Sequence, residues 1–539
     1  MRKVQIGEKQ EISVEHPGEY ELILMNLISS PIRTSSGSFR NKSYSLMLMY
    51  SNFSVYEDLH SNCLSGSVSI VDSNSMLTEF PIIGDELIEI MFRSMNTDIS
   101  IYLKFRVVEI SEIDSINDLT KAYTLVLSSP ISIRSEKQKI SKSFTGIGHK
   151  THHIIQQICE NNLNLKNEKD VQIKKIGDYS IRNKKLEEDY YRIESMSGHS
   201  EKYVAPYKSP FSVINTLCKR SVNSSGSMFY FFEDINCFRF FNLEENSRVK
   251  KNKPPVRELV YYPGNAIDRT AVNLEMYWSV AETYAIKKRF NVFENMSRGM
   301  YSSEVTFLDI EKRKAITKNY YYQHEGAEYN HTSDGYLLTS KYSDLVHNRD
   351  FESPATVQSV VSFHTGDFES QDYTLHLEEY FQRRMSMEAQ VDAIVLEVQI
   401  PGDSTGEISI GEFVNFSILS VDPKDDNSII TDPYLSGNYM VTRIHHHVSK
   451  GTNRYSMVLE LISDTVFQEY DLSPEKEFSD VESVSIQVQD TNVELTNDQE
   501  KVQTSSISNL INDAIHFPTR KRAISKLGVV ITEKDKQNV

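Results

Sequence analysis

Residues 50–92 decide the fold class, and they read YSNFSVYEDLHSNCLSGSVSIVDSNSMLTEFPIIGDELIEIMF. Apolar and polar side chains alternate within them, most clearly from Ser67 to Val71. A period of two residues is typical of a β-strand with one buried face. Turn-forming residues interrupt the pattern at residues 72–74 and 83–85. Short strands separated by turns at this spacing predict a β-sandwich or a β-barrel.

Similar strand patterns extend on both sides of this stretch, and the 29 Tyr and 25 Phe favour a strand-rich chain. In the N-terminal part they cover residues 43–51, 66–72, 86–92, 99–110 and 123–129. They return at residues 285–293, 303–308, 393–400, 413–420, 439–445 and 455–462, with a helix expected at 375–391. We predict a mainly β protein with two β-barrels, at residues 1–135 and 266–465. The second contains a weakly patterned excursion at about 320–372.

A mixed α+β insert domain is predicted between the barrels, at residues 136–265. Apolar residues at near-helical spacing predict a helix over residues 149–163. A second helix is predicted over residues 209–220, where Ser209 suits the N-cap and Pro210 the first helical position. Two very aromatic segments, residues 228–232 and 238–241, predict a pair of strands.

The composition changes after residue 465, so residues 466–539 are predicted to form an extended acidic linker and a C-terminal docking segment. The candidate partner-binding residues there are apolar positions at helical spacing and a basic cluster: Ile507, Leu510, Ile511, Ile515, Arg520, Lys521 and Arg522. A terminus without any partner is an equally good interpretation of this segment.

The overall charge limits the classes of partner. The chain has 58 basic and 75 acidic side chains, and a net charge of −17. This balance opposes binding to a phosphate backbone or to anionic lipid. It favours either simple solubility or an acidic lumen that does not hold passing DNA. The polar N-terminus predicts no secretory signal, and no apolar run is long enough to span a membrane.

Metal and redox chemistry are not expected. Cys63, Cys159, Cys218 and Cys237 are widely spaced without a CxxC motif, which favours free thiols in a reducing cytoplasm. In residues 445–447, three consecutive histidines on a strand would alternate between its faces, so we expect strand residues at a subunit or solvent face. Neighbouring histidines on a helix, as expected at residues 152–153, point about 100° apart.

Catalysis is not expected either. Acidic clusters occur at residues 187–189, 244–245 and 378–379, but adjacent acids usually form a solvated face. The sequence has no GxSxG, HExxH, P-loop or dinucleotide motif. We therefore predict no catalytic, cofactor-binding or metal-binding residues, and no enzyme.

Several motifs occur in a fixed order along the chain. The first are an aromatic-acidic element at residues 56–58, a glycine-initiated strand at 66–68, an Asp-Ser turn at 72–73 and a Gly-Asp-Glu turn at 84–86. Further matches lie at residues 209–211 with 229–232, at 299–303 with 308–310, and at 438–446 with 455–464. Together these stretches resemble the baseplate central hub family of contractile-tailed bacteriophages, whose members form a trimeric ring above the central spike.

The resemblance implies a structural hub subunit whose two β-barrels are tail-tube-like. Its homotrimeric ring would adapt the sixfold tail tube to the threefold spike, with the tube or tube-initiator protein and the surrounding baseplate wedge proteins as neighbours. DNA would pass only as cargo, and the protein would assemble in the host cytoplasm into the virion tail baseplate. The alternatives are the hub of a phage-derived contractile injection device, a hub-fused cell-wall hydrolase, and a receptor-binding protein.

Overall fold

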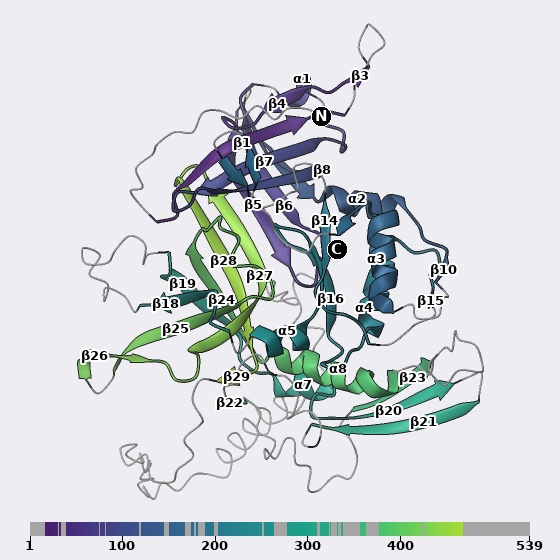
Figure 1. Ribbon diagram of the computed structural model, residues 1–539. Helices are drawn as coiled ribbons and strands as arrows, with labels where there is room; N and C mark the ends of the chain where they lie inside the picture. The colour runs from purple at the N-terminus through teal and green to yellow at the C-terminus, as the bar shows by residue number, and fades with distance from the viewer. Residues whose placement is uncertain are drawn as a thin grey trace, which may run out of the picture. The chain divides into compact units, whose positions relative to one another are not determined.

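Figure 1 shows the computed structural model of the chain. The chain divides into two units, Met1–Tyr470 and Asp471–Val539, and every residue described below belongs to the first. The structure describes residues 17–30, 32–33, 39–74, 76–80, 82–117, 120–144, 150–167, 174–176, 179–181, 189–198, 203–250, 253–262, 278–309, 313–322, 324, 331, 336–337, 356–362, 377–422 and 425–466.

The first half of the chain is almost entirely β-strand, as its alternating pattern predicts. On β6, for example, alternate residues from Gly66 to Asp72 are buried. The elements are β1 (Tyr20–Ile28), β2 (Ile32–Arg33), β3 (Phe39–Arg40), β4 (Ser43–Ser45), β5 (Tyr50–Asp58), β6 (Ser65–Asp72), α1 (Met76–Glu79), β7 (Leu87–Ser94), β8 (Ile99–Ser115) and β9 (Lys121–Ser128).

The insert follows, and it is mixed α+β as predicted. Its elements are α2 (Pro130–Lys137), β10 (Ser143–Phe144), α3 (Thr151–Asn161), β11 (Lys166–Asn167), β12 (Lys174–Ile176), β13 (Tyr179–Ile181), β14 (Tyr190–Ile193), β15 (Tyr203–Val204), α4 (Pro210–Arg220), β16 (Phe229–Glu233), β17 (Phe238–Asn242) and α5 (Leu243–Lys250). The apolar faces of α3 and α4 share one core cluster with the aromatic side chains of β16 and β17. Ser209 occupies the N-cap of α4 as expected, although its side chain makes no capping bond.

The second half returns to strands. Its elements are β18 (Arg257–Tyr261), β19 (Thr283–Lys288), α7 (Val292–Ser297), β20 (Ser302–Asp309), β21 (Lys314–Tyr321), β22 (Tyr336–Leu337), β23 (Thr356–Ser362), α8 (Leu377–Val391), β24 (Ile394–Pro401), β25 (Phe413–Asp422), β26 (Asp425–Thr431), β27 (Gly437–Ser449), β28 (Arg454–Ser463) and β29 (Thr465–Val466). The predicted class, mainly β with a mixed insert, is confirmed.

One large sheet contains strands from both halves, in the order β19-β24-β28-β27-β5-β6-β9-β8-β7-β1-β4. The two halves meet where β27 pairs antiparallel with β5, from Arg443 opposite Asp58 to Ser449 opposite Asn52. A single core cluster extends beneath both halves, with β5, β6, β9, β24, β27 and β28 all contributing. The domain boundaries drawn from the sequence stay predictions.

The sheet contains an internal repeat. The order β5-β6-β9-β8-β7 in the first half matches β19-β24-β28-β27-β25 in the second, and every neighbouring pair in both sets is antiparallel. Both sets have a β-bulge at the same place, between Val107 and Glu109 on β8 and between Val441 and Arg443 on β27. A shared bulge beside a shared strand order indicates two copies of one motif.

Three local predictions were wrong in detail. Residues 43–51 do not form one strand, because residues 46–49 turn between β4 and β5. The strand expected over residues 285–293 ends at Lys288, and α7 begins at Val292. Within the expected excursion, β23 forms an unforeseen strand parallel to β20, in a sheet with β21.

Candidate functional site

The partner-binding residues predicted in the C-terminal segment (Ile507, Leu510, Ile511, Ile515 and the basic cluster at 520–522) lie outside the described residues. Their docking role stays a prediction. The features that follow come from the described part of the chain: the junction between the halves, a pocket beside it, and two exposed strand edges.

A buried polar network holds the junction between β5 and β27. His446 is 1% exposed, and its Nε2 lies 2.7 Å from a carboxylate oxygen of Glu57. Its Nδ1 lies 2.7 Å from the hydroxyl of Tyr455, whose pKa burial raises well above the usual value. The second carboxylate oxygen of Glu57 accepts the backbone N–H of Ile235, at 3.0 Å. A carboxylate oxygen accepts, so we assign a ring proton to Nε2 of His446, which donates to Glu57. The hydroxyl of Tyr455 also donates to the backbone carbonyl of Asp403, at 3.2 Å.

The neighbouring histidines face the other side of the strand, as the alternation predicts. The ring of His445 stacks on Tyr56 with centroids 4.4 Å apart, and Nδ1 of His447 lies 3.1 Å from the hydroxyl of Ser54. Burial, followed by the charges of His447 and His446, lowers the pKa of His445 to about 4. The expectation of a subunit or solvent face was wrong for His446, because Glu57 supplies a buried partner. Among the described residues, no group of three or more His, Cys, Asp or Glu side chains is placed to hold a metal.

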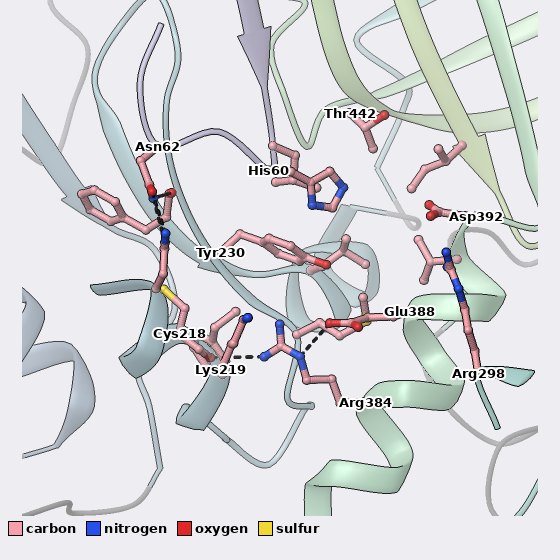
Figure 2. A pocket seen from close by; sticks show the side chains of 18 residues that line it. His60, Asn62, Cys218, Lys219, Tyr230, Arg298, Arg384, Glu388, Asp392 and Thr442 are labelled. Atoms are coloured by element: carbon pink, nitrogen blue, oxygen red, sulfur yellow. Dashed lines mark hydrogen bonds and ion pairs between the residues drawn. The ribbon is translucent and has the colours of Figure 1, made fainter. Parts of the chain in front are cut away.

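A pocket of about 390 Å³ lies beside this junction, and Figure 2 shows its side chains. It is bounded by the segment after β5, by α4 and β16 of the insert, and by the C-terminal end of α8. Its charged and polar lining residues are His60, Asn62, Asn215, Lys219, Tyr230, Arg298, Arg384, Glu388, Asp392 and Thr442.

Two pairs of polar side chains in the pocket bond to each other, Arg384 with Glu388 and Asn62 with Asn215. Nε of Arg384 lies 2.7 Å from Glu388, and its Nη1 donates to the backbone carbonyl of Ser227 at 3.1 Å. Burial raises the pKa of the Asp392 carboxyl, while Lys288, His60 and Arg298 partly oppose this. The pocket therefore combines cations and carboxylates, which suits a polar partner group better than an apolar one.

One member of an acidic pair expected on a solvated face, Glu244, is instead part of the interior. Glu244 is buried and accepts the backbone N–H of Ser227 at 2.9 Å and Nη2 of Arg383 at 2.5 Å. It thereby ties α5 of the insert to α8. Asp189 is half-buried, and the side chains of residues 378–379 lie outside the described residues.

Two strand edges of the large sheet carry exposed apolar and charged side chains. On β19 and the segment after it, Ile286, Phe290 and Phe293 are exposed, next to Lys288 and Arg289. On the last part of β8 and just beyond it the exposed apolar residues are Val108, Ile113 and Ile116, interleaved with Glu109, Glu112 and Asp114. Large exposed apolar side chains gathered at a strand edge mark an interaction surface. The sequence analysis did not assign either edge, since exposure depends on which strands are paired.

Comparison with solved structures found similar folds at low identity. A tail protein from Neisseria meningitidis is 9% identical, over 83% of this chain and 97% of that one, with a TM-score of 0.45. A 43 kDa tail protein of prophage MuSo2 from Shewanella oneidensis is 9% identical, over 82% and 99%, with a TM-score of 0.42. An Escherichia coli component of the type VI secretion system is 9% identical, over 78% and 76%, with a TM-score of 0.34.

No protein-family model and no curated protein sequence matches this chain. In the described part of the chain, no helix is long and apolar enough to cross a membrane. The function proposed below therefore rests on the strand order and on the residues of this chain.

Proposed function

We propose that this chain is a structural subunit of the baseplate hub of a contractile-tailed bacteriophage. Three copies form a ring that adapts the sixfold tail tube to the threefold central spike. The ring binds the spike on one axial face and the tube or tube-initiator protein on the other, with baseplate wedge proteins around it. The proposal includes no catalytic step.

The observation that carries the proposal is the internal repeat. Each chain contains the same five-stranded motif twice, and the β5·β27 pairing joins the two copies side by side. Three such chains would present six related motifs, although only a threefold axis relates the chains themselves. A ring of that kind can meet a sixfold partner with its motifs and a threefold partner with its chains. The order of hub-like motifs along the sequence supports the same function.

The charge of the chain suits this role. A net charge of −17 gives a ring lumen that is not expected to hold a phosphate backbone, so DNA would pass as cargo. Assembly in the host cytoplasm agrees with cysteines that are free: Cys159, Cys218 and Cys237 are buried, and Cys63 is partly buried.

The solution mass of the purified full chain tests the proposal. We expect light scattering to give three times the 62.0 kDa of one chain, alone or after addition of spike protein. Averaged electron micrographs of the particle along its axis should show six similar lobes. A stable monomer in both conditions would contradict the ring.

A second candidate function is a hub-fused cell-wall hydrolase, and the pocket is the observation that favours testing it. Glu388 and Asp392 both line it: Glu388 pairs with Arg384, whereas Asp392 has no ion-pair partner among the described residues and burial raises its pKa. Two carboxylates in different environments are the arrangement that glycoside hydrolysis needs. Zymography on peptidoglycan decides: clearing by the full chain that Asp392→Asn abolishes would support the hydrolase, and a folded protein that clears nothing would exclude it.

A further inference from the structure

We propose that neighbouring copies of this chain join by antiparallel pairing of β19 of one copy with the outer edge of β8, residues 108–115, of the next. This inference rests on the ring proposed above and names the surfaces that close it. It assigns the occupant of each exposed edge as a second copy of the same chain.

The internal repeat is the first step of the argument. In the matched strand orders, β19 takes the place of β5, and β8 takes the place of β27. Within one chain β5 and β27 pair with each other across the junction. Strands β19 and β8 hold the equivalent positions. Among the described strands, nothing pairs with β19 as β27 pairs with β5, or with β8 as β5 pairs with β27. A second junction of the same kind can form only between chains.

The backbone of β8 has the edge that this pairing needs. On β27, the N–H of Val441 donates to the carbonyl of Glu412 at 2.9 Å, and from Arg443 onward the same edge pairs with β5. On β8, the N–H of Val107 donates to the carbonyl of Glu86 at 3.0 Å, which ends the pairing with β7 in the same way. Beyond that point, no described strand pairs with this edge of β8. Unpaired N–H and C=O groups on a strand edge are a template for another strand.

Each junction brings an acidic strand and a basic strand together, but the acidic and basic members are exchanged between the two junctions. Inside the chain, Arg443 on β27 forms an ion pair with Asp58 on β5, at 2.9 Å. The residue that follows the matching bulge on β8 is Glu109, an anion in the place of Arg443. At the end of β19 the side chains are the cations Lys288 and Arg289, which form no ion pair with any described residue. Acidic β8 therefore suits basic β19.

The same reversal works against incorrect pairing. If β19 approached β27 in the register of β5, Lys288 would take the place of Tyr56, diagonally across from Arg443. If β8 approached β5, Glu109 would face Asp58 directly. Like charges directly across two strands are destabilising. The charges therefore favour pairing of β19 with β8 over pairing of β19 with β27 or of β8 with β5.

Apolar side chains at both edges support the same contact. Ile286 on β19 corresponds, across the ladders, to Val55 on β5, which is 0% exposed beside β27, whereas Ile286 is 45% exposed. On β8, Val108 and Ile113 are 45% and 57% exposed. Pairing of the two edges would cover these side chains as β27 covers Val55. Each copy offers one edge of each kind, so the contact is head-to-tail, and three such contacts related by a threefold rotation would close the proposed ring.

Charge reversal tests the proposal. The variants are Lys288→Glu with Arg289→Glu on β19, Glu109→Lys with Glu112→Lys on β8, and all four changes together. Light scattering gives the mass, and circular dichroism confirms the fold. We expect each double variant to fall from three times 62.0 kDa to the mass of one chain, with a dissociation constant about tenfold higher or more. The fourfold variant, in which the charges again oppose each other, should regain the trimer.

Lys253→Glu, a charge reversal at an exposed position outside β8 and β19, is the matched control and should remain trimeric. If the wild-type chain is a trimer and both double variants stay trimeric, these edges are not the contact, while the ring itself still stands. If the double variants are monomers but the fourfold variant does not recover, the pairing of β19 with β8 is also rejected. A wild-type chain that is monomeric with and without spike protein overturns the ring and this inference together.

Discussion

Strands β5 and β19 occupy the same place in the repeated motif but have opposite surroundings. Most of β5 is buried, and it has a hydrogen-bonded neighbour on each edge, β6 and β27. Most of β19 is exposed, and within the described residues it has a neighbour on one edge only, β24. The difference shows that the second neighbour, not the strand order, decides whether this position of the motif is interior. A single chain thus contains a filled junction, where β5 pairs with β27, and an open junction, where β19 and the outer edge of β8 have no such partner among the described strands.

The largest expected effect is at the filled junction. Glu57→Ala would leave Nε2 of His446 and the N–H of Ile235 without a partner in the interior. We expect the free energy of unfolding, measured by urea denaturation, to fall by about 3–5 kcal/mol, because removing one member of a buried polar pair leaves the other unpaired.

Glu112→Ala, on the exposed edge of β8, is the matched control for that change. In the isolated monomer it should alter the free energy of unfolding by no more than about 0.5 kcal/mol. Equal losses at the two positions would mean that the filled and open junctions do not differ as described.

A change in the shared core sharpens the comparison. Leu125 on β9 and Leu459 on β28 occupy equivalent positions of the repeat, and each is 0% exposed. Replacing either by alanine should lower the free energy of unfolding by about 3 kcal/mol. Because one core extends under both halves, each change should shift the same unfolding transition. Two separate transitions, each moved by only one of the changes, would show that the halves unfold independently, and Leu48→Ala, at an exposed position, should move neither.

The smallest expected effect is a dependence on pH at the filled junction. The pKa of His445 is about 4 in the folded chain and 6.5 in an unfolded one. Between these values the unfolded chain binds the proton and the folded chain does not, so stability is lost as pH falls from 6.5 towards 4. Allowing for solvent screening of a partly exposed ring, we expect a loss of about 1 kcal/mol between pH 7 and pH 5.

Urea denaturation of His445→Gln at both pH values checks this, and the pH-dependent loss should shrink by about the same amount. Ser111 is the counterpart of His445 on the open edge of β8. A histidine placed there by Ser111→His should add no comparable loss in the monomer. An unchanged pH dependence in His445→Gln would assign the acid sensitivity to another group.

Local structure followed from the sequence wherever the pattern was local. The alternation around β6 and the Ser-Pro start of α4 depend on neighbouring residues, so these elements were predicted correctly. The turn between β4 and β5 was missed because its residues Leu46, Met47, Leu48 and Met49 are apolar and continue the strand pattern. Apolar residues in a turn give no local sign of it.

The candidate site depended on contacts between distant residues. His446 looked like a surface histidine because its partner Glu57 lies 389 positions away in the chain. The exposed edge of β19 could not be told from that of β5, because the residues of a strand do not show whether a second strand will pair with its other edge. Only the pairing pattern of the folded chain distinguishes them, and no alternation of residue types encodes it.

The junction between β5 and β27 also sets an order of events during synthesis. Asp58 and Arg443, which pair across it, are 385 residues apart, so a ribosome needs roughly 20–80 s to make the second after the first. During that interval the edge of β5 that later binds β27 has no partner within its own chain. A nascent chain therefore passes through a stage in which the edge of β5 is as open as β19 in the finished chain. The like charges of Asp58 and Glu109 would oppose pairing of that edge with β8 of a neighbouring chain.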